Sequence, residues 1–322
     1  LGGDLFALFW SAEEGKLVGL DATGRAGAKM TPEQIRADGF DRVPGSGPGA
    51  VTVPGAIAGW GALNERYGSM SLAEILAPAI ALAEEGFPVT PIIANQWSDQ
   101  TAKLKQDRGA TDTYLIDGER SPKAGEWFRN HDFARSLRMI AREGPAAMYG
   151  GNLGQTVIEG LAKLGGYLTL DDMEAMEVRW VEPLSMDYKG WTVWELPPAG
   201  QGISVLQMLG MLEPFDLVSM GHNSAEYLHH LIEAKKVAFA DLARHVADAA
   251  HMEIDPKALI DPSYLESRQS LIDPNRAAVR VEPGKFATAT ETIYLSVADS
   301  DGNMVSFIHS IFGSFGSGVV VP

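Results

Sequence analysis

The feature that most constrains this chain is a strand–turn–strand pattern at residues 290–310, "TETIYLSVADSDGNMVSFIHS". Two runs of alternating apolar and polar residues are separated by "SDG". A three-residue loop that closes with a glycine in left-handed geometry is a favoured hairpin connection, and Gly302 occupies that position. The pattern therefore predicts a β-hairpin in which Asp299 pairs with Asn303.

The register of this hairpin follows by counting outward from the turn. A two-residue loop would shift every pair by one and mix polar with apolar side chains on each face, so the three-residue loop fits better. One face then carries Ile293, Leu295, Val297, Val305 and Phe307, and the other carries Thr292, Tyr294, Ser296, Ser306 and Ser310. Ile293 faces His309, and Thr292 faces Ser310. The register thus predicts two hydroxyls side by side at the open end of the hairpin.

Charge and composition restrict the partners of the chain. Its 322 residues are 45% hydrophobic and 21% charged, with a formal net charge of -16. Such a composition is typical of globular proteins, and the summed negative field repels nucleic acid and anionic membranes. We therefore expect a small-molecule or peptide substrate, with no nucleic-acid or membrane partner. The chain has no cysteine, which excludes disulfides and thiolate chemistry but leaves both a cytoplasmic and an exported location open.

The two ends of the sequence indicate an internal piece of a longer chain. It opens with "LGGDLFALFW", which lacks Met and already has a strand-like pattern, and it stops at "GSGVVVP". No apolar run reaches the roughly 18 residues that a membrane-spanning helix needs. We expect a fold that is incomplete at both ends.

The remaining sequence switches between strand and helix periods, which predicts a mixed α+β fold. Strands are expected at 4–10 and 15–24, and a hairpin at 182–198. Helices are expected at 54–68, 71–87, 130–144, 152–164, 169–176, 202–213 and 224–250. The Pro- and Asp-rich region 255–285 is interpreted as a loop or surface linker that contains one short helix at 261–273.

Thr292 has a possible chemical role at the hairpin entrance. A threonine hydroxyl is a poor nucleophile unless a base takes its proton, and its own free α-amine, with a pKa of about 7.7–8.0, suits that task. Thr292 is internal, so this chemistry requires prior cleavage of the bond between Glu291 and Thr292. Threonine is also favoured in strands, so the residue alone fits a plain strand position as well.

The stretch "TIYLSVADSDGNMVSFIHSIFGSFGSGVV" resembles the start of the small subunit of γ-glutamyltranspeptidases, which are N-terminal nucleophile hydrolases. The segments "GGDLFALFW", "GGYLTLDDM", "PPAGQGISVLQMLGMLE" and "AKKVAFAD" resemble the same family in order and spacing. The resemblance implies an αββα sandwich, with residues 1–291 as a large-subunit region and 292–322 as the start of a small subunit.

The resemblance also implies an activity: autocatalytic cleavage, then transfer of a γ-glutamyl group from glutathione or a related amide to water or an amino acid. The two subunits would stay associated, and no cofactor is needed. Thr292 would be the nucleophile and, through its free amine, the general base. Ser310 would be the supporting hydroxyl, although an ordinary polar strand position is an equal alternative for it.

Several positions depart from the family pattern. Thr23 occupies the place of an arginine that holds the substrate carboxylate, and Arg25, two residues later, could be a clamp or a plain surface residue. Phe312 replaces a common asparagine, and Tyr294 a histidine. These changes resemble the branch that includes cephalosporin acylase-type enzymes. Arg25 and Phe312 are therefore candidate substrate-binding residues, and another amide acylase or a non-catalytic, uncleaved relative remain alternatives.

Two further expectations concern what the chain lacks. The family's downstream glycine pair for the oxyanion hole would lie beyond Pro322, so we expect the 322 residues alone to be inactive. "DSDGN" resembles part of a calcium loop, but Ser310 stands where the twelfth-position Glu is required. The histidines show no zinc-binding spacing, and solvated or core positions suit them better. No metal site is predicted.

Overall fold

A computed structural model describes residues 2–281 and 293–321 of the chain. Its strands are β1 (Asp4–Ser11), β2 (Lys16–Ala22), β3 (Phe87–Pro88), β4 (Trp127–Phe128), β5 (Arg179–Val181), β6 (Leu184–Tyr188), β7 (Trp191–Glu195), β8 (Ile293–Ala298) and β9 (Met304–Ser310). Its helices are α1 (Pro32–Ala37), α2 (Ala56–Tyr67), α3 (Leu72–Glu85), α4 (Pro91–Asp99), α5 (Thr101–Leu104), α6 (Arg108–Tyr114), α7 (His131–Glu143), α8 (Asn152–Lys163), α9 (Leu170–Glu174), α10 (Ile203–Leu212), α11 (Ala225–His245) and α12 (Pro262–Gln269).

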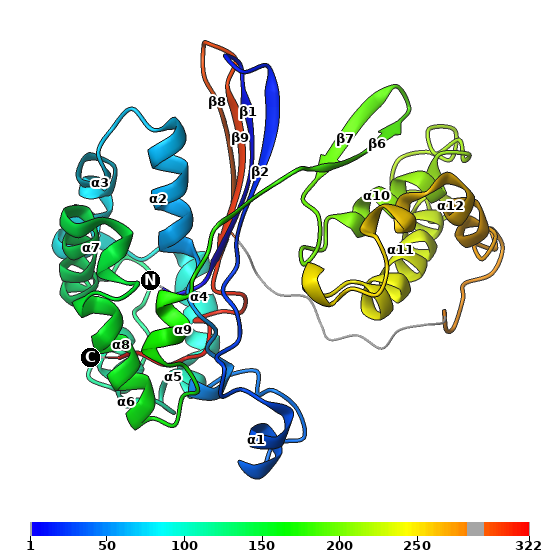
Figure 1. Ribbon diagram of the computed structural model, residues 1–322. Coiled ribbons are helices and arrows are strands. Elements are labelled where there is room, and N and C mark those ends of the chain that lie inside the picture. The colour runs from blue at the N-terminus through cyan, green and yellow to red at the C-terminus, as the bar shows by residue number, and fades with distance from the viewer. Residues whose placement is uncertain (1, 282–292, 322) are drawn as a thin grey trace.

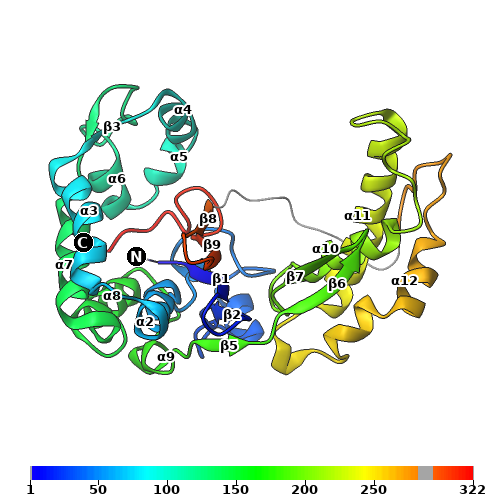
Figure 2. The ribbon, with the colours of Figure 1, turned by 90° about the horizontal axis from the view of Figure 1, so that it is seen from above.

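A central sheet stands between two helical bodies (Figures 1 and 2). Helices α2 to α9 lie on one side of it. On the other side, β6, β7 and α10 to α12 form a separate lobe, which the chain enters after β5. Within the described ranges, no helix combines the length and apolar character needed to cross a bilayer.

The predicted hairpin is present with the predicted register. Ile293 pairs with His309, and the pairing continues to Ala298 and Met304. At the turn, the Asp299 amide donates to the Asn303 carbonyl at 3.1 Å, and Gly302 has a φ of +87°. The three-residue loop is thus confirmed. Thr292 and Glu291 lie outside the described residues, so the pairing of Thr292 with Ser310 stays a prediction.

The hairpin belongs to a five-stranded sheet in the order β5-β2-β1-β9-β8. β1 pairs antiparallel with β9, which places Asp4 opposite Ser310. On one face, buried side chains pack against α2: Leu5, Ala7, Leu20 and Ala22 with Ala56. Because side chains alternate along a strand, Asp4 and Ser310 lie on the opposite face.

The α+β class agrees with the expectation, with one difference in the layers. The sandwich implied by the resemblance has two sheets between helices. The described residues form this single large sheet and two small two-stranded sheets, β3-β4 and β6-β7. The expected helices are present, and the Ser71 to Glu74 capping box opens α3. α11 ends at His245, before the predicted end at Ala250, because Val246 already has an extended conformation.

The sequence reading missed three consecutive short helices, α4 to α6. Each spans four to nine residues, too short for a clear apolar period. They are held by tertiary packing around Trp97 and Leu104, against which Phe315 also packs. Local propensity alone would not keep such short helices folded.

The predicted loop region 255–285 is described up to residue 281, and its first part is folded and packed. The short helix expected at 261–273 is present as α12, and a 3-10 turn at Pro256–Ile260 precedes it. Leu259, Leu265 and Ile272 are buried, Leu265 and Ile272 in a cluster with Met211 of α10. The interpretation as a loop or surface linker was therefore wrong for residues 256–260, because this segment is too short to show a helical period, whereas the short helix expected at 261–273 is confirmed.

A buried polar network joins the three helices of this second lobe. Arg268 on α12 contacts Asp241 on α11 through two bonds, Nη2 to Oδ1 at 2.7 Å and Nε to Oδ2 at 3.0 Å. The Gln207 amide on α10 donates to the same carboxylate at 3.1 Å. Asp241 is only 1% exposed, so its charge depends on these partners.

Arg268→Met should destabilise the protein by about 3–5 kcal/mol, because it leaves the Asp241 carboxylate buried without its cation. Arg244→Met is the matched control on α11. Its partner Glu253 is 77% exposed, so a loss of about 0–1 kcal/mol is expected. Urea unfolding followed by tryptophan fluorescence measures both changes. Equal losses in the two variants would contradict the importance of the buried pair.

Candidate active site

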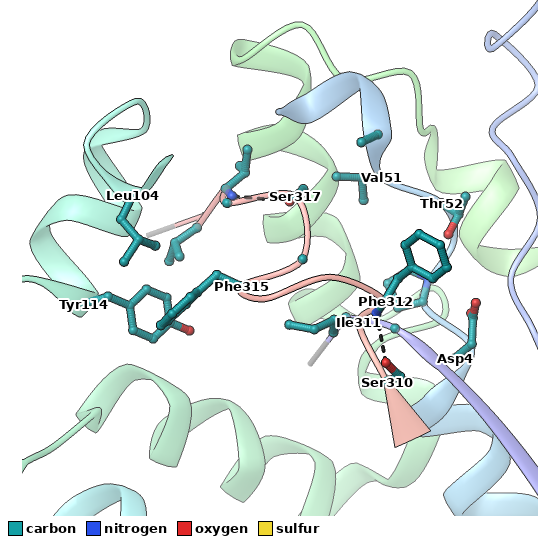
Figure 3. Close-up of a pocket in the computed structure, with 18 residues that line it drawn as sticks. Asp4, Val51, Thr52, Leu104, Tyr114, Ser310, Ile311, Phe312, Phe315 and Ser317 are labelled. Carbon is teal, nitrogen blue, oxygen red and sulfur yellow. Dashed lines mark hydrogen bonds between the residues drawn. The ribbon is translucent and has the colours of Figure 1, made fainter. Parts of the chain in front are cut away.

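A cavity of about 280 Å³ lies at the open end of the hairpin (Figure 3). Its walls come from four parts of the chain: the start of β1, the segment before α2, the ends of the short helices α5 and α6, and the end of β9 with the glycine-rich segment that follows it. The lining residues are Gly2, Gly3, Asp4, Ala50, Val51, Thr52, Pro54, Leu104, Tyr114, Ser310, Ile311, Phe312, Phe315, Gly316, Ser317, Gly318, Val319 and Val320.

Ser310, the predicted supporting hydroxyl, is the last residue of β9 and lines this cavity. Its Oγ accepts a hydrogen bond from the Phe312 amide at 3.0 Å. This contact fixes the hydroxyl at the point where the strand ends and the glycine-rich segment begins. Thr292, the predicted nucleophile, and Glu291 are not among the described residues, so no contact places them here.

Asp4 is a site residue that the sequence reading missed. It lies opposite Ser310 on β1, and its Oδ1 accepts a hydrogen bond from the Gly24 amide at 2.9 Å. Burial, with a smaller effect from the nearby negative charge of Asp21, raises the pKa of the Asp4 carboxyl to about 6. The available signal was an acidic residue directly before the apolar run "LFALFW". Among the cavity-lining residues that the structure describes, Asp4 is the only carboxylic acid.

The loop after β2 holds the position where the family arginine was expected. Asp21 is buried, contacts Arg179 at 2.6 Å, and accepts from both the amide and the hydroxyl of Thr23. Arg25 is exposed and is absent from the cavity lining. Its carbonyl accepts from the Val53 amide at 3.0 Å, so its backbone is fixed while its side chain faces solvent. The structure therefore does not bring Arg25 into the cavity.

Phe312, the other substrate-binding candidate, does line the cavity. Its side chain is 68% exposed, and its φ is +73°, a left-handed conformation that is uncommon for a bulky residue. Phe315 shares this property with a φ of +58°, but its ring packs against Trp97 and Tyr114. Phe312 thus presents an open apolar surface next to Ser310 and Asp4 (Figure 3).

The arrangement combines hydroxyls with a half-buried acid and apolar walls. Thr52, Ser310 and Ser317 supply hydroxyls, and Tyr114 supplies a phenol whose pKa is raised by burial. Such a site can position a polar amide through neutral hydrogen bonds while apolar walls hold the attached group.

The raised pKa of Asp4 has a measurable consequence for stability. The folded state favours the neutral form of the Asp4 carboxyl. Its contribution to the free energy of unfolding is therefore fully present below about pH 4 and is lost as the pH rises through about 6. Asp4→Asn does not titrate. The unfolding free energy of the variant relative to the original protein should therefore improve by about 2–3 kcal/mol between pH 4 and pH 7. Urea unfolding across this range tests it, and parallel pH curves for the two proteins would refute it.

Known proteins match the chain over its full length. The sequence profile of the family described as Gamma-glutamyltranspeptidase matches residues 1–322. The "Acylase ACY 1 proenzyme" of Pseudomonas sp. (strain SE83) is 36% identical over 319 residues, covering 96% of this chain and 57% of that protein. The "Glutathione hydrolase-like YwrD proenzyme" of Bacillus subtilis (strain 168) is 35% identical, covering 99% of this chain and 60% of that protein.

A solved structure agrees with these matches. Cephalosporin acylase from Bacillus halodurans superposes with a TM-score of 0.92 at 39% identity, covering 100% of this chain and 59% of that one. The chain thus spans about three fifths of the length of these relatives. With the family profile matched from end to end and relatives above 30% identity, the chain belongs to the γ-glutamyltranspeptidase family of N-terminal nucleophile hydrolases.

Proposed function

We propose that the whole protein is a self-cleaving amide hydrolase or transferase in which Thr292 is the nucleophile and γ-glutamyl amides such as glutathione are the substrates. The observation that carries this proposal is the register of β8, β9 and β1. One more pair at the end of β8 would bring Thr292 next to Ser310, whose other neighbour is Asp4. All three side chains would then share one face of the sheet at the cavity.

The chemistry follows from a threonine with a free α-amine. The amine takes the hydroxyl proton as Oγ1 attacks the amide carbonyl, and the proton then passes to the leaving amine. The acyl group remains on Thr292 as an ester. Water or the amine of an amino acid next attacks this ester, and the threonine is regenerated. Ser310 would hold the Thr292 hydroxyl in the attacking position.

The pairing of β1 with β9 also supports association of the two subunits after cleavage. β1 precedes the proposed cut and β9 follows it, yet the strands pair from Asp4–Ser310 to Trp10–Met304. A cut between Glu291 and Thr292 would leave this backbone ladder intact. The segment after the cut is further anchored by Phe315, which packs between Trp97 and Tyr114.

A different acyl group is the second candidate, favoured by two placements. Arg25 lies outside the cavity lining, so the described site offers no arginine for a γ-glutamyl carboxylate. Phe312 instead adds an apolar surface beside Ser310. The names of the relatives include both an acylase and a glutathione hydrolase-like protein, which fits either choice.

The proposal predicts that the full-length precursor cuts itself into two fragments. A denaturing gel with mass spectrometry should show a new fragment that begins at Thr292. Thr292→Ala should leave one uncut chain with no amidase activity, because both the nucleophile and its cleavage site are lost. A single uncut chain of the unaltered protein under all conditions would refute the proposal.

Ser310 offers a sharper comparison in the same experiment. Ser310→Ala should slow amide hydrolysis, and Ser310→Thr should restore most of it. Ser306→Ala is the matched control on the same strand and face, because its hydroxyl contacts Tyr294 at 3.2 Å instead of the cavity. An equal loss in Ser306→Ala would assign the effect to the strand, not to the hydroxyl.

Acyl preference can be measured with γ-glutamyl, glutaryl and phenylacetyl anilides. If Phe312 forms the acyl-binding surface, Phe312→Ala should raise KM for the phenylacetyl substrate about tenfold, as expected for loss of roughly 1.4 kcal/mol of apolar contact. Arg25→Ala should leave KM for the γ-glutamyl substrate unchanged if the arginine is a surface residue. A large rise in that KM would instead support the clamp.

A further inference from the structure

The segment that follows Ser310 forms one wall of the cavity in an unusual conformation. Between Ile311 and Val320, eight residues line the cavity, among them Phe312 and Phe315. Both phenylalanines have positive φ angles, which bulky side chains rarely adopt. Such a conformation persists only where the surroundings hold it. Something outside the segment must therefore fix its backbone.

Lys103 supplies that restraint from behind the wall. Its ammonium donates to the Ser314 carbonyl at 2.8 Å and to the Gly316 carbonyl at 2.5 Å. These two carbonyls flank Phe315 on either side. The aliphatic part of the Lys103 side chain also packs closely on Gly318. A Cβ at position 318 would lie only 3.0 Å from the Lys103 Cε. The Lys103 side chain thus contacts Ser314, Gly316 and Gly318 of the turn.

The surroundings of Lys103 indicate that its ammonium group interacts mainly with these two carbonyls. Among the ion pairs of the described residues, none involves Lys103, whereas the neighbouring Lys105 pairs with Glu119 at 2.7 Å. The Lys103 side chain is partly buried, and burial lowers its pKa. Desolvating an ammonium is unfavourable unless hydrogen bonds replace the lost water, and the two carbonyls provide them.

We propose that Lys103 is a positioning residue that clamps the turn at residues 313–318 and so fixes the cavity wall next to Ser310. It does not itself line the cavity, so it acts through the turn. The wall includes Phe312, whose amide donates to the Ser310 hydroxyl. Loosening the turn would therefore widen the substrate-binding surface. The catalytic consequence rests on the proposed function, whereas the clamp itself does not.

Hydrogen exchange with mass spectrometry on the full-length protein tests the clamp without any substrate. Lys103→Met keeps the apolar stem but removes the donors. Amides of residues 313–318 should then exchange about 10- to 100-fold faster, the range expected for loss of a hydrogen bond to a charged group. Lys105→Met, which loses only an exposed ion pair, should leave that exchange unchanged. Unchanged exchange in Lys103→Met would overturn the clamp.

Kinetics on the same variants test its effect on the substrate site. Because the wall contacts substrate in both the ground state and the transition state, Lys103→Met should raise KM about tenfold and change kcat by less than about threefold. Lys103→Arg retains donors for both carbonyls and should recover most of the original KM. An unchanged KM in Lys103→Met would refute the link to the substrate site.

The two proposals fail in different ways. An unaltered protein that is never cut before Thr292 and hydrolyses no amide would refute the proposed function. The exchange measurement would still decide whether Lys103 clamps the turn. A protein that is cut and active, but whose turn exchanges equally in the original and Lys103→Met forms, would refute only the clamp.

Discussion

The pairing of β1 with β9 is the contact on which the site depends. It joins the two ends of the sequence, and it places Asp4 directly opposite Ser310. Without this ladder, the β8–β9 hairpin would be isolated. An isolated two-stranded hairpin has only marginal stability in water. The same ladder would keep the segments on both sides of the proposed cut together. The pairing that builds the sheet therefore also brings the site residues Asp4 and Ser310 together.

The two faces of the sheet differ: one is buried against a helix, and the other carries the polar side chains of the candidate site. Apolar side chains of β1 and β2 bury one face against α2, while the other face carries Asp4 and Ser310 at the cavity. The glycine-rich segment after β9 then turns away from the sheet and forms a wall, held by the Phe315 ring and the Lys103 ammonium. The cavity thus lies at one end of the strands, between the sheet and this segment.

The hairpin register could be predicted from the sequence because its determinants are local. The alternation of apolar and polar residues, together with the glycine at the turn, fixes every cross-strand residue pair from Ile293 onward. The β1–β9 pairing could not be predicted in this way, because nothing in either strand specifies a partner so distant in sequence. For that reason Asp4 was missed: its relevance appears only when Ser310 lies beside it. The helices α4 to α6 were missed for a similar reason, since their stability comes from packing around Trp97.

The two candidate substrate-binding residues, Phe312 and Arg25, also differ in how well the sequence predicted their positions. Phe312 was identified by comparison of a motif next to Ser310, and its place in the cavity follows from the continuous chain. Arg25 was identified by position along a loop, where a shift of two residues changes the direction of the side chain. The contacts of Asp21 with Thr23 and Arg179 fix that loop, and they leave Arg25 exposed. Loop geometry of this kind depends on tertiary contacts that the sequence pattern does not contain.

The most direct test of the account is a crystal structure of the full-length, mature protein at the end of β8. We predict that Thr292 has a free amino group and that its Oγ1 lies about 2.5–3.0 Å from the Ser310 Oγ, with Asp4 on the other side of Ser310. A register shifted by one residue, or a Thr292 hydroxyl directed to the opposite face of the sheet, would contradict the proposed site.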